Sequence, residues 1–177
     1  MVFLLTANLV ALLAAIQDFR SGQISNRITY ATLLLSPPLH ALVARQIGGD
    51  LRQCAIAAGV SLLGALLCGL LPFLLWLKGV CGGGDVKLFA ALGAVLEPFM
   101  GLEAQVYAYY VAALTVPLGL LYRGTFWRTL KSSWTLLVNS FRPTSKRVAL
   151  EPSKTWFRLG PAIWGGCLLT AWMHWRG

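Results

Sequence analysis

The sequence predicts an all-α fold, an integral membrane bundle of about six transmembrane helices plus one cytoplasmic interfacial amphipathic helix. Two compositional observations favour it. Of the 177 residues, 57% are hydrophobic and only 12% are charged, which is about half the charged share of a soluble domain. The mean hydropathy is +0.67. The third observation is a series of apolar runs near the roughly 20 residues that span a bilayer, so we expect 1–177 to form a single polytopic membrane domain.

Six apolar runs supply the expected spans. The first ends at Asp18, and no basic region precedes it, which argues against a signal peptide. The second contains Pro37-Pro38, which should bend or interrupt it, and the short fourth run is interrupted by Glu97-Pro98. In chain order the runs cover about 2–17, 28–44, 54–77, 88–102, 104–122 and 159–174.

The segment 123–158 is neither a span nor a simple loop. Apolar residues recur at helical spacing from Trp127 to Phe141, while basic and polar residues such as Arg128 and Lys131 take the other face. This pattern predicts an amphipathic helix that lies in the headgroup region. A helix that binds a partner or guides a substrate is the alternative interpretation.

Basic residues predict how the chain is oriented. The net charge is +9, and 12 of the 15 Lys and Arg lie in the segments 18–27, 78–87 and 123–158. Basic residues near span ends are retained in the cytoplasm, so these segments should be cytoplasmic and both termini outside. We therefore interpret the charge as a signal for orientation and for contact with anionic membrane lipid, and not as a nucleic-acid binding surface.

Two aspartates are the candidate catalytic residues. Of the six acidic residues, Asp18 closes the first run and Asp85 opens the fourth, whereas the others lie in loops or at span ends. The predicted topology brings both to the same, cytoplasmic, face. Ionisable residues at membrane depth are costly and tend to be functional. The alternative is that each is an ordinary boundary charge paired with Arg20 or Lys87.

Two close carboxylates can hydrolyse an amide without a metal or a covalent nucleophile. Like charges a few ångströms apart do not both ionise cheaply, so the pair shares one proton. The ionised carboxylate takes a proton from water, and the protonated one polarises the scissile carbonyl. Because such a pair titrates as a unit, the sequence leaves open which aspartate is the acid and which is the base.

The glycines beside Asp85 favour a site that accepts an extended chain. Gly82, Gly83 and Gly84 fall in a predicted turn over 78–87. Without a Cβ, glycines let another backbone approach closely, as an unwound peptide substrate would need. A flexible turn between two spans is the alternative.

Other hydrolytic chemistries find little support. The sequence has no H-E-x-x-H and no G-x-S-x-G, and His40 and His174 are expected near the outer ends of their runs. We therefore expect no metal and no other cofactor. None of the four cysteines forms a C-x-x-C pair, and we interpret them as apolar packing residues.

Three segments resemble the type IV prepilin peptidases of bacterial pilus systems. Residues 18–26 match their D-x-R-x-x-x-I-x-N segment, and residues 82–87 match their G-x-G-D-[VI]-K segment. Residues 158–162, Arg-Leu-Gly-Pro-Ala, are similar to the proline-containing start of their last span. The order and spacing agree, and the resemblance covers nearly the whole chain.

The resemblance implies an aspartic endopeptidase of the G-x-G-D type in the bacterial inner membrane. It would remove the short basic leader of prepilins and pseudopilins at the cytoplasmic face, typically after glycine. The catalytic roles carry over onto Asp18 and Asp85. Other residues match the family pattern and are expected to support the substrate loops: Arg20, Asn26, Gly82, Gly84 and Lys87.

The position of Asp18 distinguishes two forms within the family. The larger, bifunctional members have an N-terminal cytoplasmic region that is linked to N-methylation of the new terminus. Asp18 comes too early for such a region, so the chain resembles the short, peptidase-only forms of tight-adherence (Tad/Flp) pilus systems. We accordingly expect no methyltransferase activity.

Two other classes of protein remain open at this stage. One is another aspartic membrane protease, presenilin-like or of the lipoprotein signal peptidase kind; presenilin-like enzymes have a Tyr-Asp context, whereas here Gln17 precedes Asp18. The other is a non-enzyme, either a small membrane transporter or a secretion-system scaffold. A transporter would hold its aspartates near the membrane midplane. The sequence leaves the cleaved pilin, the cleavage rule and the oligomeric state open.

Overall fold

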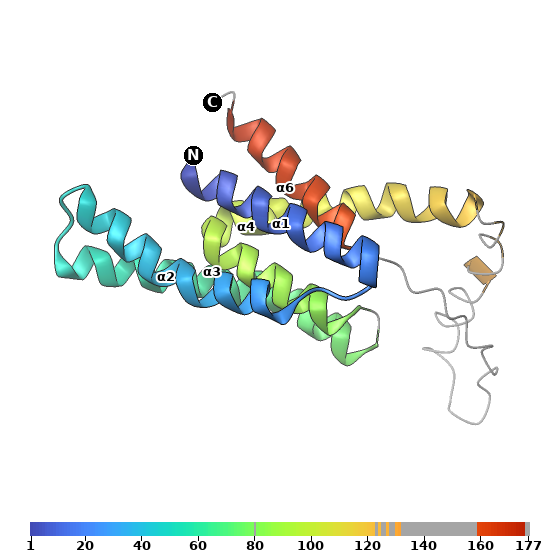
Figure 1. The fold of residues 1–177 in the computed structure, drawn as a ribbon, viewed down its shortest axis with the longest axis horizontal. Coiled ribbons are helices and arrows are strands. Elements are labelled where there is room, and N and C mark those ends of the chain that lie inside the picture. The colour runs from blue at the N-terminus through green and yellow to red at the C-terminus, as the bar shows by residue number, and fades with distance from the viewer. Residues whose placement is uncertain (80, 123, 125–126, 128–129, 132–158, 176–177) are drawn as a thin grey trace. The chain divides into compact units, whose positions relative to one another are not determined.

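The regular structure in the described part of the chain is α-helical. The computed structural model describes residues 1–79, 81–122, 124, 127, 130–131 and 159–175. The predicted all-α class is confirmed for these residues, and the predicted interfacial helix lies largely outside them. The helices are α1 (Val2–Ser21), α2 (Asn26–Gln46), α3 (Leu51–Leu77), α4 (Gly83–Tyr122) and α6 (Gly160–Trp175) (Figure 1).

The helices fall into two compact units. One contains Met1–Ala112 together with Arg158–Gly177, and the other contains Ala113–Phe157. Within the first unit, α1 lies beside α6 and α2 lies beside α3 (Figure 1). Every contact that builds the candidate site belongs to this first unit.

Three of the described helices are long and apolar enough to cross a membrane: α1, α3 and α4. This finding supports the predicted membrane character of the chain. It does not reproduce the count of six spans, which stays a prediction. The helix α6 has 16 residues, somewhat fewer than the roughly 20 that match a bilayer core.

The helix α4 folds back on itself at Glu97. This residue has φ 62° and ψ 174°, a conformation that L-residues rarely adopt. In a straight helix Phe89 and Tyr109 would lie about 30 Å apart, but their ring centroids are 5.6 Å apart. The chain therefore reverses at Glu97, and α4 consists of a first arm, 83–96, and a second arm, 98–122.

The reversal corrects one expected boundary. The apolar pattern continues past Glu97 and placed the end of the fourth run near 102, but the turn lies at Glu97-Pro98. Proline cannot donate the backbone hydrogen bond of a helix interior and disfavours helical geometry in the residue before it. The missing N–H of Pro98 leaves the Ala94 carbonyl without a helical partner, and the second effect acts on Glu97, so the proline and not the apolar pattern determines where the arm ends.

Buried side chains satisfy the carbonyls at the end of the first arm. Carbonyls in the last turn of a helix lack helical partners. Ser61 on α3 donates its hydroxyl to the Ala94 carbonyl at 2.7 Å. His40 on α2 lies with Nε2 3.1 Å from the Val95 carbonyl oxygen. The reversal is thereby tied to two neighbouring helices.

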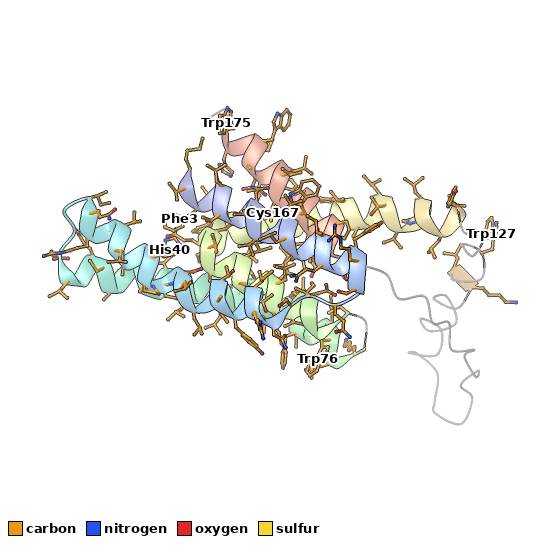
Figure 2. The ribbon with its side chains drawn as sticks, viewed as in Figure 1. Phe3, His40, Trp76, Trp127, Cys167 and Trp175 are labelled. Atoms are coloured by element: carbon orange, nitrogen blue, oxygen red, sulfur yellow. The ribbon has the colours of Figure 1, made fainter. Side chains whose placement is uncertain are left out.

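His40 is more deeply placed than the sequence indicated. Its side chain is buried, its Nδ1 lies 3.2 Å from Glu97 Oε1, and its ring stacks on Phe3 with centroids 3.8 Å apart (Figure 2). The expected position of His40 at the outer end of a run stays a prediction, and the structure shows that His40 is part of the packed interior.

The helix α2 continues through its two prolines. Of the two expected effects of Pro37-Pro38, an interruption is wrong, because both residues lie inside one continuous helix, and a bend stays a prediction. The φ of proline is close to the helical value, so the free-energy cost of proline in this helix comes mainly from the backbone hydrogen bonds that its missing N–H cannot form. Nearby hydroxyls bond carbonyls one turn earlier, Thr32 to Ile28 at 2.8 Å and Ser36 to Thr32 at 2.6 Å.

Small residues bring the helices of the first unit close together. A Cβ added to Gly93 would lie 2.3 Å from the carbonyl oxygen of Gly64 on α3. A Cβ on Gly166 of α6 would lie 2.5 Å from the Ala104 carbonyl oxygen on the second arm of α4. Without a hydrophobic driving force between helices in lipid, such close backbone packing is a main source of association. These contacts hold α3 and α6 against α4.

Candidate active site

Asp18 is carried to the interior by the end of α1. Ala7, Ala11 and Ala14 form a fully buried stripe at helical spacing, and Asp18 lies one turn further along it. Its side chain is 6% exposed. The helix ends at Ser21, and Gly22 takes the left-handed conformation that closes it, with φ 66° and its N–H donated to the Asp18 carbonyl.

The first residue of α6 holds the Asp18 carboxylate. The Gly160 N–H donates a hydrogen bond of 2.9 Å to Asp18 Oδ2. A helix N-terminus presents unpaired N–H groups and a partial positive charge, both of which favour an anion. A Cβ on Gly160 would lie only 2.8 Å from Asp18 Cβ and 3.1 Å from the Ala15 Cα. Glycine is therefore favoured at position 160, because a residue without a Cβ lets the backbone N–H come close enough to bond the Asp18 carboxylate.

Asp85 is held in a similar way at the start of α4. Its Oδ2 accepts the Gly82 N–H at 3.2 Å, and its own N–H donates to the Gly82 carbonyl at 3.1 Å. The helix begins at Gly83, so the predicted turn over 78–87 is too long: Asp85 and Lys87 belong to the helix. A carboxylate in the first turn is favoured by the helix dipole.

The two aspartates interact electrostatically, since the negative charge of Asp18 acts on Asp85. Each has one oxygen held by a backbone N–H, from Gly160 for Asp18 and from Gly82 for Asp85. Side chains anchored in this way keep their orientation while the remaining oxygen stays available for chemistry.

Two contacts join the loop after α1 to the start of α4. Ile24 packs against Gly84, where an added Cβ would lie 3.5 Å from the isoleucine Cβ. Lys87 Nζ donates to Asn26 Oδ1 at 3.0 Å, and the same ammonium lies 5.1 Å from the centroid of the Tyr30 ring. The segments that carry the two aspartates are thus cross-connected outside the carboxylates themselves.

The remaining predicted support residues divide into two groups. Asn26, Gly82, Gly84 and Lys87 all take part in the contacts at the carboxylates or between their two segments. Arg20 lies exposed in the last turn of α1, and no contact described here brings it to the pair.

Comparison with known proteins identifies the family. A family model described as the type IV leader peptidase family matches residues 5–123. The chain belongs to the type IV leader peptidase family. The matched range contains both aspartates and the Asn26–Lys87 contact, and membership makes the chain a protease. Comparisons with curated proteins and with solved structures find no match.

Cys81 is the thiol nearest to the site of this leader peptidase family member. Its Sγ lies 3.1 Å from the Pro72 carbonyl oxygen, to which the thiol donates. Burial, and after it the negative charge of Asp85, raise the pKa of the Cys81 thiol. A thiol that holds its proton is a poor nucleophile, so Cys81 is suited to packing and hydrogen bonding.

Within the described residues, His, Cys, Asp and Glu side chains form no group of three that could hold a metal ion. The absence of a cofactor stays a prediction. The chemistry that the described site offers is that of two carboxylates and the backbone amides that hold them.

Sequence reasoning missed the contact of Gly160 with Asp18 and a buried polar contact on the second arm of α4. Gly160 was noted only for its resemblance to the start of the last span in the family. Tyr109 and Gln105 on the second arm of α4 were not singled out, yet the buried Gln105 donates from Nε2 to the Tyr109 hydroxyl at 3.2 Å. A polar pair at i and i+4 in an apolar span was the available signal.

Proposed function

We propose that the chain is an integral-membrane aspartic endopeptidase with Asp18 and Asp85 as its catalytic pair. The observation that carries the proposal is the meeting of these two carboxylates, from α1 and α4, in a chain of the leader peptidase family. Two interacting carboxylates, each held by a backbone N–H, are the groups that metal-independent amide hydrolysis needs.

The reaction proceeds through a tetrahedral intermediate. One carboxylate is ionised and the other protonated, since like charges at close range do not both ionise cheaply. The ionised carboxylate removes a proton from a water molecule while the oxygen of that water bonds to the scissile carbon. The protonated carboxylate gives its proton to the carbonyl oxygen. As the C–N bond breaks, the carboxylate that took the proton from water gives it to the leaving amine, and the other carboxylate takes a proton back from a hydroxyl of the intermediate.

The two roles stay unassigned between the aspartates. Asp18 and Asp85 each accept a backbone N–H at the N-terminus of a helix, α6 for Asp18 and α4 for Asp85. Because the two supports are of the same kind, they do not distinguish the acid from the base, and either carboxylate can act as the base.

The proposed substrates are type IV prepilins and pseudopilins. Cleavage would remove the short basic leader at the cytoplasmic face of the bacterial inner membrane, before the hydrophobic helix of the pilin. The charge distribution of the chain supports this orientation, because 12 of the 15 Lys and Arg lie in segments placed on the same side as both aspartates. The resemblance to short Tad/Flp-type enzymes favours a peptidase without methyltransferase activity.

Co-expression with a candidate prepilin tests the function. The expected result is a pilin that loses its leader, seen as a mass decrease equal to the leader, with the chain and not with Asp85→Asn. Processing that is equal with and without the chain, at verified expression in the membrane, would contradict the proposal.

A further inference from the structure

The Tyr109 hydroxyl, on the second arm of α4, accepts a hydrogen bond from a buried amide. Gln105 is 3% exposed and donates from Nε2 to the Tyr109 hydroxyl oxygen at 3.2 Å. A phenolic hydroxyl has one hydrogen to donate and accepts through its oxygen. Because the oxygen accepts from Gln105, the Tyr109 hydrogen is left for a different partner.

The ring of Tyr109 is positioned over the face of α4 that carries Asp85. Phe89 follows Asp85 by one helical turn and so shares its face. The Phe89 and Tyr109 rings pack with centroids 5.6 Å apart at an interplanar angle of 38°, and Phe89 is 4% exposed. The fold-back at Glu97 is what brings the second arm, with Tyr109, to this level of the first arm.

The hydroxyl is also within electrostatic reach of the site. Tyr109 interacts electrostatically with Asp85 and with Cys81. Tyr109 is half-buried, while its neighbour Tyr110 is 64% exposed. Tyr109 is therefore the less exposed of these two tyrosines and the one with a described interaction with Asp85.

We propose that Tyr109 is a third catalytic residue, whose hydroxyl donates a hydrogen bond to the scissile carbonyl oxygen as negative charge develops there. The proposal rests on the proposed function. Tyr109 transfers no proton: the carboxylates carry out both proton transfers, and the hydroxyl stabilises the oxygen during the attack of water. Preorganised donors aimed at developing charge act strongly in a site with little water.

The carbonyl oxygen of the substrate is the proposed partner of the Tyr109 hydroxyl because both aspartates already have hydrogen-bond donors. Each carboxylate is supported by a backbone N–H at Oδ2, whereas the substrate oxygen gains charge only during reaction. Because Gln105 already orients the Tyr109 hydroxyl, little reorganisation is needed when charge develops on the substrate oxygen. The buried amide thus acts as the positioning residue for the hydroxyl.

The test compares Tyr109→Phe with Tyr110→Phe in detergent-purified full-length protein on a synthetic prepilin peptide. Phenylalanine keeps the ring and its contact with Phe89. It also leaves the Gln105 Nε2 without its partner, so Tm is measured beside the kinetics to separate a loss of stability from a loss of catalysis. Tyr109→Phe should lower kcat on the order of 10²-fold, the usual cost of one such donor, with little change in KM. Tyr110→Phe makes the same chemical change on the exposed neighbour and should retain kcat and KM.

Gln105→Met supplies an independent measurement. Methionine keeps the length of the side chain and removes the N–H that orients the hydroxyl. The loss in kcat should be smaller than for Tyr109→Phe, and the double variant should be no slower than Tyr109→Phe alone, because the amide acts through the hydroxyl. Additive losses, an unchanged kcat for Tyr109→Phe, or an effect on KM alone would each overturn the proposal.

Asp85→Asn in the same assay separates this inference from the function it rests on. If Asp85→Asn is inactive and Tyr109→Phe is as fast as the unchanged chain, the tyrosine has no catalytic role and the aspartic mechanism stands. If Asp85→Asn still cleaves, the two-aspartate mechanism itself is wrong.

Discussion

The N–H of Gly160 donates a hydrogen bond of 2.9 Å to Asp18 Oδ2, across 142 residues of sequence. It places the N-terminus of α6 against the carboxylate at the end of α1. No larger residue fits, because a Cβ at position 160 would lie 2.8 Å from Asp18 Cβ. The orientation of one proposed catalytic carboxylate therefore depends on a glycine in a different helix.

Gly160→Ala should displace Asp18 and lower prepilin processing by at least about tenfold, since small misplacements of a catalytic group cost up to about 10²-fold. Gly59→Ala is the matched control, because no heavy atom lies within 4 Å of a Cβ added there; it should retain activity. Both variants are compared at equal protein levels in the membrane. Full activity of Gly160→Ala would show that the contact does not position Asp18.

Asp18→Asn and Asp85→Asn should each reduce processing by about 10²–10⁴-fold, the usual loss of general acid–base catalysis. Each change keeps the size and removes the titratable group. Because the two act as a unit, the double variant should be scarcely slower than either single variant. The assay is the fraction of prepilin cleaved at matched expression.

Glu97→Gln makes the same carboxylate-to-amide change about 18 Å from Asp85 along the first arm of α4. The variant should process prepilin at close to the normal rate, as should Glu151→Gln. Substantial cleavage by either aspartate variant would contradict the mechanism. If Asp18→Asn or Asp85→Asn failed to accumulate in the membrane, the result would instead favour a structural role for the two aspartates.

Lys87→Met and Asn26→Ala should each slow processing about fivefold, which corresponds to roughly 1 kcal/mol for one hydrogen bond. The two residues bond each other at 3.0 Å, so the double variant should lose no more than either single one. Lys78→Met removes an exposed lysine in the turn before α4 and should have no effect. Multiplicative losses in the double variant would show that the two side chains act separately.

His40→Phe should lower the thermal stability of the purified protein while leaving kcat near normal. Phenylalanine can keep the stack on Phe3, but it leaves the Val95 carbonyl and Glu97 without their contacts to the imidazole. Leaving a buried acceptor unsatisfied costs about 1–3 kcal/mol. The measurement is Tm in detergent together with the peptide assay.

The control for this variant is His174→Phe. His174 forms the other described histidine–glutamate pair, at 2.8 Å to Glu103, but both side chains are about one third exposed. An exposed pair contributes little to stability, so its Tm should change less than that of His40→Phe. An equal decrease in both variants would contradict the role of His40 in holding the reversal.

Reporter fusions test the topology. Fusions after Arg27 and Lys87 should report the cytoplasmic side, and fusions near Asp50 and at the C-terminus should report the outside. A fusion at Phe99 should also report the outside, because α4 reverses at Glu97. A cytoplasmic signal at Phe99 or at the C-terminus would exclude the six-span arrangement.

Local patterns in the sequence predicted most of the helices. Apolar runs reproduced α1, α3 and α6 within a few residues, because hydropathy over about 20 residues is a direct consequence of the bilayer core. The apolar pattern was inaccurate at prolines, where backbone geometry and hydrogen bonding also affect where a helix ends. Glu97-Pro98 turns the chain inside an apolar run, whereas Pro37-Pro38 leaves α2 unbroken, and hydropathy does not distinguish these two outcomes.

The sequence by itself determined the membrane class, the helical fold, the two aspartates at helix ends and the motif residues Asn26 and Lys87. All of these depend on residue type and short-range spacing. The tertiary structure alone decided that Gly160 supports Asp18, that Asn26 bonds Lys87 and that Tyr109 packs against Phe89, one turn after Asp85. The physical reason is that these contacts depend on which helix backbones can approach one another. Small residues such as Gly64, Gly93 and Gly166 determine that approach across helices, and their pairing is not contained in any local pattern.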